Sequence, residues 1–423
     1  MADWIETTIG EQATLQRGFD ITKAEQRIGN VPVISSGGTS SYHDTALIKG
    51  PGVVLGRKGV VGSVYFIASD YWPHDTTLWV KDFHGNDQRF VYYFFKHLTP
   101  WLIKMDVGSA NPTLNRNHVH PMPTVWPPLP EQKAISNILG TLDDKIELNR
   151  KMNETLEEIA RAIFKSWFID FDPVRAKAEG RWKKSQSLPG MPAEMYDLWP
   201  DSFVGSSLGP IPKGWKAGKI GDFCNVQGGF AYKSEDFTDS GHPVIKIKNI
   251  QQDKSVDFDD IQFISKDLAN NTEDYWLNDG DLVMAMTGAT VGKFGLIVNK
   301  YAWRAVLNQR VARLKSHLKG DDKIWFVYCI LCLEDIFYQV VSIADGSAQP
   351  NISADGIMST TAFVPDDRII YNFNSTVEPL FQNITFNIKQ SHTLGAIRDS
   401  LLPKLLSGEI RVKDAVKFIE GIT

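Results

Sequence analysis

An internal duplication constrains the fold of this chain more than any other feature. Three N-terminal patterns recur at one offset of 211 (215 − 4): Trp4-Ile5-x-x-x-x-Ile9-Gly10 as Trp215-Lys216-x-x-x-x-Ile220-Gly221, Gly18-Phe19 as Gly229-Phe230, and Pro32-Val33-Ile34 as Pro243-Val244-Ile245. Further along, Gly108-Ser109-Ala110-Asn111-Pro112 recurs as Gly346-Ser347-Ala348-Gln349-Pro350 at an offset of 238 (346 − 108). That offset then persists for more than fifty residues. The chain is therefore built from two similar copies, and the second copy carries insertions.

Each copy has a globular part followed by a helical part. The globular parts are rich in Gly, Pro, Val, Ile and aromatic residues, with strand-like runs such as Gly52-Val53-Val54-Leu55 and Asp281-Leu282-Val283-Met284. They also contain some helix, for example residues 88–98 and 323–337. The helical parts hold almost no Gly or Pro. We therefore expect an α+β fold in which an internal pseudo-twofold repeat relates two globular α/β domains and two long helices.

Apolar residues recur at heptad spacing in both helical parts. The first helix has Ile135, Leu142, Asn149, Leu156 and Ile163 at position a, Ile138, Met152 and Ile159 at position d, and Leu139 and Ile146 at position e. The second has Phe373, Leu380, Asn387, Leu394 and Leu401 at position a. A helix of roughly 38 residues is about 57 Å long. Its apolar stripe needs a partner, and the two helices can provide one for each other.

The two helices are expected to pair antiparallel, as a coiled-coil spacer between the globular domains. A single Asn at a central position a costs stability but fixes the register. We expect Asn149 to meet Asn387, the alternative being that both amides face solvent or cap neighbouring side chains. The predicted helix-pairing residues are Leu142, Ile146, Asn149, Leu156, Leu380, Ile384, Asn387 and Leu394.

Six segments follow from this pattern: a first globular domain (1–128), a central spacer helix (129–172), a connector (173–213), a second globular domain (214–365), a C-terminal spacer helix (366–410) and a tail (411–423). The connector has three Gly-Pro-type breaks. We expect it to be packed over the surface or partly mobile, with an exposed helix over residues 175–184.

Composition is compatible with a soluble, cytoplasmic protein. Residues 1–6 lack a signal-peptide pattern, and no apolar run approaches the roughly 20 residues that span a bilayer. The three cysteines form no disulfide framework, and Cys329-x-x-Cys332 lies in an apolar stretch expected to be a core helix rather than a metal site. The formal net charge of −5 argues weakly against nucleic-acid binding. Local basic loops can still contact DNA.

Two sets of polar residues suit DNA recognition. The first set is Arg57 and Lys58 in copy one and Thr287 and Lys293 in copy two, within glycine-rich turns that allow close backbone approach. The second set is Asn111, Asn115, Arg116 and Asn117 in copy one, with Gln349 and Asn351 in copy two. Asn and Gln can pair with adenine and Arg with guanine, but the same residues also form turns and helix caps. Lys246, Lys248 and Asn249, in an alternating strand-like run, are weaker candidates.

No catalytic or metal site is expected. The run around Val291-Gly292-Lys293 departs from a phosphate-binding loop, because its glycine spacing is one residue short and Phe294 replaces the required Ser or Thr. His118-x-His120 and His74-Asp75 have no convincing third ligand or nucleophile in the sequence. We interpret them as loop histidines.

The whole chain resembles the specificity subunit of type I restriction–modification systems. The resemblance is carried by Pro128-Leu129-Pro130-Glu131-Gln132-Lys133-Ala134-Ile135, which resembles the start of the family's central conserved region, and by Trp167-Phe168-Ile169-Asp170-Phe171-Asp172-Pro173-Val174 at its end. Leu401-Leu402-Pro403-Lys404-Leu405-Leu406-Ser407-Gly408-Glu409-Ile410 resembles the C-terminal conserved region. One departure is that the second helix opens with Pro365-Asp366-Asp367-Arg368 instead of the Pro-Leu-Pro-Glu-Gln string.

The resemblance implies two target-recognition domains, each reading one half of a split DNA sequence. It also implies partners: double-stranded DNA, two adenine methyltransferase subunits that use S-adenosylmethionine, and two restriction subunits that use ATP and Mg²⁺. The chain itself is expected to bind no cofactor and to catalyse nothing, since it has no methyltransferase motif and no Walker lysine. The alternatives are a self-contained methyltransferase or nuclease, and a scaffold that has lost DNA binding.

Overall fold

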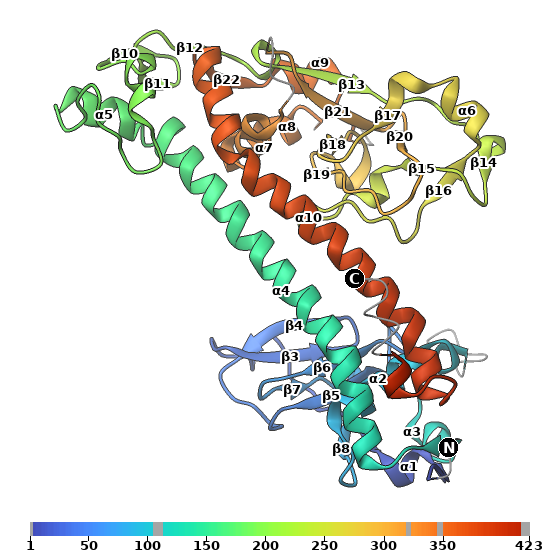
Figure 1. Ribbon diagram of the computed structural model, residues 1–423. Helices are drawn as coiled ribbons and strands as arrows, with labels where there is room; N and C mark the ends of the chain where they lie inside the picture. Colours follow the sequence, from blue (N-terminus) through green and yellow to red (C-terminus); the bar gives the residue numbers. More distant parts are fainter. Residues whose placement is uncertain (1–2, 105–112, 319–322, 345–349, 416–423) are drawn as a thin grey trace. The chain divides into compact units, whose positions relative to one another are not determined.

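The computed structural model describes residues 3–104, 113–318, 323–344 and 350–415 (Figure 1). The chain divides into two compact units, one formed by residues 1–147 and 393–423 and the other by residues 148–392. We call them unit 1 and unit 2. Among the described residues, no single helix is long and apolar enough to cross a membrane, although one bent pair of short helices in unit 2 reaches the required length and composition together.

Unit 1 contains three small sheets. Its four-stranded sheet has the order β2-β8-β5-β6, a second has the order β4-β3-β7, and β1 pairs with β9. The elements are β1 Ile5–Thr8, α1 Ile9–Gln12, β2 Thr14–Arg17, β3 Val31–Ser35, β4 Gly38–His43, β5 Gly52–Gly56, β6 Val64–Ile67, β7 Trp72–Pro73, β8 Thr77–Asp82, α2 Gln88–Lys104, α3 Arg116–Val119 and β9 Pro123–Trp126.

Unit 2 contains the same architecture with additions. Its four-stranded sheet has the order β13-β21-β18-β19, its second sheet has the order β14-β16-β15-β20-β17, and β12 pairs with β22. The elements are α5 Asp172–Ala178, η1 Ala193–Leu198, β10 Phe203–Ser206, β11 Gly209–Pro212, β12 Lys216–Lys219, η2 Ile220–Asp222, β13 Cys224–Gly228, η3 Ser234–Asp236, β14 Phe237–Thr238, β15 His242–Ile245, η4 Ile247–Asn249, β16 Gln262–Ile264, α6 Lys266–Asn270, η5 Glu273–Tyr275, β17 Trp276–Leu277, β18 Leu282–Ala285, η6 Gly288–Thr290, β19 Phe294–Leu296, β20 Ala305–Leu307, β21 Val311–Ser316, α7 Trp325–Leu331, α8 Glu334–Ser342, α9 Ala354–Ser359 and β22 Thr361–Val364.

The duplication is visible in the strand register. Strand β1 pairs with β9, and β12 pairs with β22, at the two offsets found in the sequence, because 216 − 5 is 211 and 361 − 123 is 238. Strands β3 and β7 form a parallel pair in unit 1, and β15 and β20 form the corresponding parallel pair in unit 2. The predicted α+β class and internal repeat are confirmed.

Two long helices complete the fold. Helix α4 spans Leu129–Phe168 and helix α10 spans Asp367–Leu406, each with 40 residues, so both their starts and their ends differ by 238. Each begins in one unit and ends in the other. They run antiparallel in both units: in unit 1 Asp143 pairs with Arg398 (2.5 Å), and in unit 2 Phe164 packs on Phe373 with ring centroids 5.7 Å apart.

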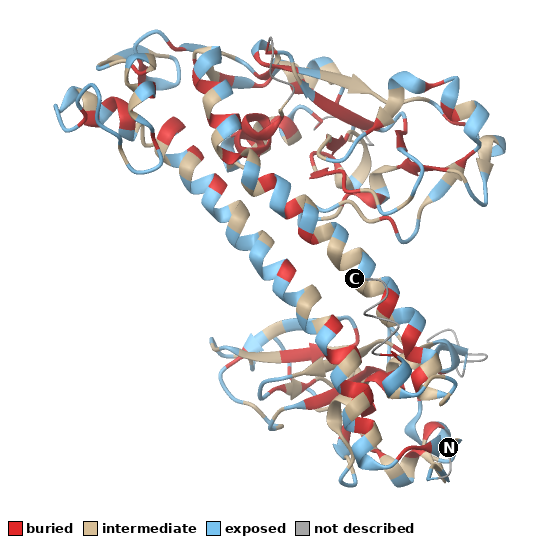
Figure 2. Ribbon diagram, viewed as in Figure 1, coloured by how far each residue is buried: buried red, intermediate tan, exposed pale blue. Residues whose placement is uncertain are grey.

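The helices close the core of each unit. In unit 1, buried residues of α2 such as Phe90 and Phe95 share one apolar cluster with sheet residues and with Leu139 and Leu401 of the long helices. In unit 2, α7 has the same role and packs with Phe373 and Phe381 of α10. A stripe of buried residues therefore runs along each long helix (Figure 2).

The buried stripe differs from the heptad expectation at position d. The residues predicted at position a of α4, Leu142 and Asn149 among them, are buried or half-buried. Met152 and Ile159, predicted at d, are exposed at 39% and 44%. Leu139 and Ala160 are buried instead. The helix turns its a and e positions inward, because a globular domain as well as the partner helix packs against it.

The connector expectation is wrong in part. Helix α5 ends at Ala178, so no exposed helix continues to residue 184, and Val174 and Ala176 of α5 are buried. Beyond it, Trp182 and Trp199 are fully buried in the main core of unit 2, where Trp199 packs against Trp167 with ring centroids 5.6 Å apart. The segment is an integral part of unit 2. Aromatic anchors with no regular spacing hold it there, and periodicity cannot reveal such anchors.

Candidate nucleic-acid interface

Three segments far apart in sequence meet in unit 1. The turn after β5 supplies Arg57 and Lys58, whose N–H groups both donate to the carbonyl of Thr76, at 2.9 and 3.1 Å. The carbonyl of Arg57 accepts from the N–H of Leu114 at 2.8 Å, and Lys58 forms an isolated antiparallel bridge with Thr113. Residues 56–59, 74–77 and 113–117 therefore form one backbone cluster, which we call the reading turns of unit 1.

Unit 2 repeats two of these hydrogen bonds and the isolated bridge. The N–H of Met286 donates to the carbonyl of Arg310, and the N–H of Ile352 donates to the carbonyl of Met286, both at 2.9 Å. Thr287 forms the isolated bridge with Asn351. Residues 286–289, 308–310 and 350–353 are the reading turns of unit 2. In both units the structure thus brings members of the two predicted sets together: Arg57 and Lys58 with residues 113–117, and Thr287 with Asn351.

Side chains at matching positions of the reading turns differ in chemistry. The shared hydrogen bonds match Lys58 with Thr287, Asp75 with Gln309, Thr76 with Arg310 and Thr113 with Asn351. Lys58 is exposed in unit 1, as are Gln309, Arg310 and Asn351 in unit 2. One backbone frame therefore presents a lysine beside a carboxylate in one unit, and two amides beside a guanidinium in the other.

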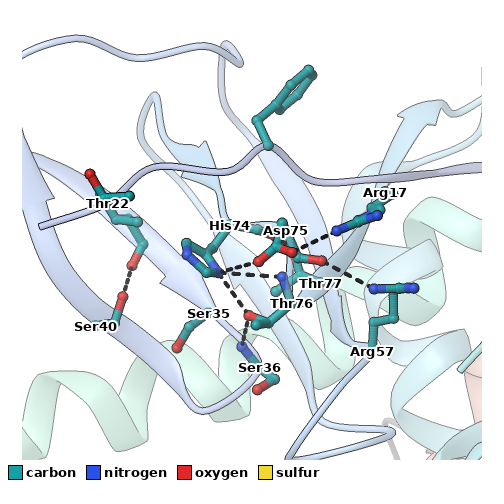
Figure 3. A network of polar contacts seen from close by, with 12 residues as sticks. Arg17, Thr22, Ser35, Ser36, Ser40, Arg57, His74, Asp75, Thr76 and Thr77 are labelled. Carbon is teal, nitrogen blue, oxygen red and sulfur yellow. Dashed lines mark hydrogen bonds and ion pairs between the residues drawn. The ribbon is translucent and has the colours of Figure 1, made fainter. Parts of the chain in front are cut away.

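A polar network supports the reading turns of unit 1 (Figure 3). The Arg17 guanidinium bonds the Asp75 carboxylate at 2.6 Å, and Arg57 donates to the carbonyl of Asp75 at 3.4 Å. His74 Nδ1 lies 3.1 Å from both Asp75 Oδ1 and Thr76 Oγ1. Arg17 remains 57% exposed. Both guanidinium groups are held in place while retaining N–H groups that can bind a phosphate or a guanine edge.

Asp20 lies near His74 and Asp75, for which the sequence showed no third ligand. One ligand atom from each of these three residues lies within 4.8 Å of the others. The Asp75 carboxylate is already bonded to Arg17, which removes charge from any cation site. We therefore interpret the group as part of the polar network.

The second predicted set in unit 1 has mixed placement. Asn115 caps the short helix α3, because its side chain accepts from the N–H of Asn117 at 3.0 Å. Arg116 and Asn117 are exposed within the reading turns. His120 is structural: its Nε2 accepts from the N–H of Leu15 at 2.9 Å. Two further predicted residues, Asn111 and Gln349, lie outside the described residues.

The candidates in residues 246–249 are engaged within unit 2. This segment ends β15 and enters the 3-10 helix η4; it is not an alternating strand. The Lys246 ammonium contacts Gln262 and lies 3.7 Å from the ring centroid of Phe237, and Lys248 pairs with Asp260 at 2.6 Å. Asn249 is 3% exposed and donates to the carbonyl of Asp257 at 3.0 Å. Burial removes Asn249 from any DNA surface.

The two candidates of the first set in unit 2, Thr287 and Lys293, have different surroundings. Thr287 is half-buried within the reading turns, and its hydroxyl is buried without a hydrogen-bond partner among the described residues. Lys293 lines a hollow together with Gln252, Glu334 and Tyr338. Thr287 therefore belongs to the reading turns, whereas Lys293 faces the α7–α8 region.

The helix-pairing residues include a polar bridge at the predicted place. Asn149 is fully buried, and its Nδ2 donates to the carbonyl of Asn387 (3.3 Å), to Gln390 Oε1 (2.9 Å) and to Ser391 Oγ (3.2 Å). Asn387 donates in turn to Asn153 Oδ1 at 2.9 Å. Each amide thus bonds a different group on the opposite helix. Of the apolar members, Leu142 and Ile384 are buried, and Ile146, Leu156, Leu380 and Leu394 are half-buried.

Sequence reasoning missed three members of the reading turns, Asp75, Gln309 and Arg310, which contribute exposed or half-exposed polar groups. It also missed Arg17, which bonds Asp75 from outside the reading turns. The signal of the three members is present in the duplication: His74-Asp75-Thr76 and Asn308-Gln309-Arg310 occupy matching positions at an offset of 234 (310 − 76). That offset lies between the two that the repeated motifs show.

Comparison with known proteins gives the family. The family model described as "Type I restriction modification DNA specificity domain" matches residues 1–158 and 212–373, once for each copy. The chain belongs to this family. Both repeats of the specificity domain are therefore present, and the long helices fall partly inside each match.

Similar proteins agree with this assignment. The type I restriction enzyme MjaIX specificity subunit of Methanocaldococcus jannaschii is 29% identical over 336 residues, covering 78% of this chain and 71% of that protein. The HindI specificity subunit of Haemophilus influenzae is 28% identical and covers 66% of this chain and 67% of that protein. Among solved structures, the S subunit of a type I restriction–modification system from M. genitalium has a TM-score of 0.54 at 16% identity, over 95% of this chain and 96% of that one. That structure supports the fold: two globular domains with two long helices.

Proposed function

We propose that the chain is the DNA-recognition subunit of a type I restriction–modification complex and that the reading turns of each unit recognise one half of a bipartite site. The observation that carries this proposal is that the reading turns of the two units share backbone hydrogen bonds and a bridge but carry different side chains. Lys58, Asp75 and Thr113 in unit 1 correspond to Thr287, Gln309 and Asn351 in unit 2. A duplicated DNA reader needs this combination to recognise two different half-sites.

The chemistry of unit 2 suits base edges in a major groove. The Arg310 guanidinium can bond the O6 and N7 of guanine together, and the amides of Gln309 and Asn351 can each bond the N6 and N7 of adenine. In unit 1, Lys58 and the two network arginines offer donors to guanine or phosphate. We infer that unit 2 contributes more direct base contacts per reading turn than unit 1.

The chain acts through partners in this proposal. We propose that it binds double-stranded DNA together with two methyltransferase subunits, and with two restriction subunits when DNA is cut. S-adenosylmethionine, ATP and Mg²⁺ are then bound by those subunits, and this chain carries out no catalysis itself. A supporting observation is that the family model for the specificity domain matches both copies of the chain.

One experiment can distinguish the half-site read by unit 2 from the half-site read by unit 1. Methylated adenines are mapped in cells that carry the methyltransferase subunits and either the wild-type chain or the Q309A/R310A variant. We expect the half-site read by unit 2 to become degenerate or to lose methylation, while the other half-site and the gap stay unchanged where methylation remains. Each lost bidentate base contact is worth about 1–3 kcal/mol of discrimination.

A matched control removes two exposed side chains elsewhere in unit 2. Arg181 and Lys184 are 60% and 71% exposed and lie in the segment that precedes the second specificity domain, so R181A/K184A should leave the motif intact. A motif unchanged in Q309A/R310A would exclude these residues from recognition. Methylation unchanged when the whole gene is deleted would instead mean a scaffold without DNA reading, which the paired specificity domains do not favour.

A further inference from the structure

Unit 2 carries a surface cluster that unit 1 lacks. Between β15 and β18 there are 36 residues (282 − 245 − 1), against 16 between β3 and β5 (52 − 35 − 1). The longer segment forms α6, η5 and β17, and it places Lys266 and Trp276 beside Trp303 and Arg304, which directly precede β20. We call Lys266, Trp303 and Arg304, with Trp276 and His242 beneath them, the basic aromatic patch.

Aromatic rings hold the two cations of this patch. The Lys266 ammonium lies 5.8 Å from the ring centroid of Trp303, and the Arg304 guanidinium lies 5.1 Å from that of Trp276. His242 packs against both indoles, with centroids 5.9 Å from Trp276 and 5.2 Å from Trp303. Its Nδ1 lies 2.9 Å from the carbonyl of Arg304, so the ring donates to this carbonyl and fixes the backbone below the guanidinium.

The positive charge of the patch is not neutralised. Among the residues that the structure describes, no carboxylate lies within ion-pair distance of Lys266 or Arg304, although both are exposed. Some other exposed cations of unit 2 are neutralised, because Lys248 pairs with Asp260 and Lys184 with Asp197. A cation–π contact restrains a cation without cancelling its charge. Trp303 adds a large aromatic surface that is 46% exposed. The patch is thus a restrained, uncompensated pair of cations.

The patch is continuous with the reading turns through a single strand. Arg304 precedes β20, and Asn308, Gln309 and Arg310 follow it. Arg310 lies six positions after Arg304. At about 3.3 Å per residue these positions span at most about 20 Å, which corresponds to roughly six base pairs of duplex at about 34 Å per turn. One duplex can therefore reach both ends of this strand.

We propose that the basic aromatic patch binds the phosphate backbone of the duplex flanking the half-site read by unit 2. The inference rests on the proposed reading function and adds a second contact that carries affinity but no sequence information. Two adjacent uncompensated cations match a polyanion with regularly spaced charges, and the exposed indole can pack on a sugar. Because α6 has no counterpart among the described elements of unit 1, the footprint of the chain is longer on the side of unit 2.

The test compares DNA binding by the assembled complex of this chain with its methyltransferase subunits. Affinity for a duplex that contains the mapped site is measured as a function of salt for wild type, K266A/R304A and the matched control R181A/K184A. We expect K266A/R304A to weaken binding roughly tenfold at low salt and to reduce the salt slope by about 2, one for each lost phosphate contact. The control should match wild type. The base preference of K266A/R304A should be unchanged.

A footprint gives an independent readout. Hydroxyl-radical protection should shorten by several base pairs on the unit 2 side in K266A/R304A and stay the same on the other side. Wild-type affinity, slope and footprint in K266A/R304A would overturn the patch while leaving the reading function intact. Weakened assembly with the methyltransferase and an unchanged salt slope would assign the patch to a protein contact instead. A wild-type complex without any sequence preference would reject the reading function itself.

Discussion

Asn149 shows what one buried polar residue contributes to the helix pair. It is fully buried and gives its two amide hydrogens to groups on α10, the shortest bond being to Gln390 Oε1 at 2.9 Å. In N149A, the half-buried side chains of Gln390 and Ser391 and the carbonyl of Asn387 lose this donor. Losing the hydrogen bonds of this site costs about 1–3 kcal/mol. We expect the free energy of unfolding of N149A to fall by this amount in urea titrations of the purified chain.

Asn137 provides the control for this prediction. It lies on the same helix with an exposed side chain, so N137A should change the stability by no more than about 0.5 kcal/mol. If N149A and N137A unfold at the same urea concentration, the polar bridge contributes nothing to stability and serves the register alone.

His120 predicts a pH dependence. Burial, with a smaller contribution from the nearby charge of Arg116, lowers the pKa of His120 from its ordinary value of 6.5. The unfolded chain therefore takes up this proton first as the pH falls. The stability that neutral His120 provides is complete above pH 6.5 and is lost as the pH falls through the lower folded pKa. Protonation also removes the acceptor for the N–H of Leu15.

The H120Q variant isolates this effect. A glutamine oxygen can accept the same hydrogen bond without titrating, so stability should fall less between pH 7.5 and 5.5 in H120Q than in wild type. The variant H118Q, at the exposed neighbouring histidine, should keep the wild-type slope. Equal slopes for H120Q and wild type would show that His120 does not contribute to the acid sensitivity.

Residue types predicted the reading turns only in part. Arg57, Lys58 and Asn351 were found because glycine-rich or polar turns are recognisable in sequence. Asn249 was misassigned, because an amide that closes a turn inside a domain has the same local sequence signature as an exposed one. Arg310 was missed because its partner segments lie about 24 and 41 residues away, and only the folded backbone brings them together.

At the scale of the element, the starts of the two long helices were predicted to within one residue, but both helices end four residues before the predicted segments do, and one face was wrong. The a positions were right because the apolar residues at seven-residue spacing leave no other choice. Apolar residues occur both at position d, as Met152 and Ile159, and at position e, as Leu139 and Ile146. The sequence does not show which of these two positions a globular domain covers. In unit 1, helix α2 packs with α4 in one apolar core, and position e is buried there, because Leu139 is fully buried in that core.

A pair of truncations tests this helix face. Leu142 is 5% exposed in the core of unit 1, and Ile159 is 44% exposed on the same helix. L142A should lower the free energy of unfolding by about 2–4 kcal/mol, because it leaves a cavity. I159A should stay within about 0.5 kcal/mol of wild type. The reverse order in urea titrations would restore the heptad assignment with position d buried.

At the scale of the whole molecule, the duplication predicted more than the local patterns did. Two offsets read from the sequence reappear in the strand pairs β1–β9 and β12–β22 and in the ends of α4 and α10. The insertions of unit 2, including α6, fall between the repeated motifs, where the offset rises from 211 to 238. Their structure was not predictable, since a segment with no counterpart in the first copy has nothing to be compared with.

The repeat also makes the spacing between half-sites testable. Lys151 of α4 and Lys389 of α10 are matching positions, because 389 − 151 is 238. Inserting seven residues after both keeps the heptad phase of each helix and lengthens each by about 10 Å. If the helices set the distance between the two reading sites, the gap in the methylated motif should grow by about three base pairs. Mapping methylated adenines measures this gap directly.

Insertion in one helix alone is the matched control. Seven extra residues after Lys151 only would displace Asn149 and its partners on α10 from their register, so we expect methylation to be lost or strongly reduced. The double insertion restores the pairing and should restore methylation at the longer gap. Methylation that persists at the original gap in the double insertion would mean that the helices join the specificity domains without measuring the DNA between them.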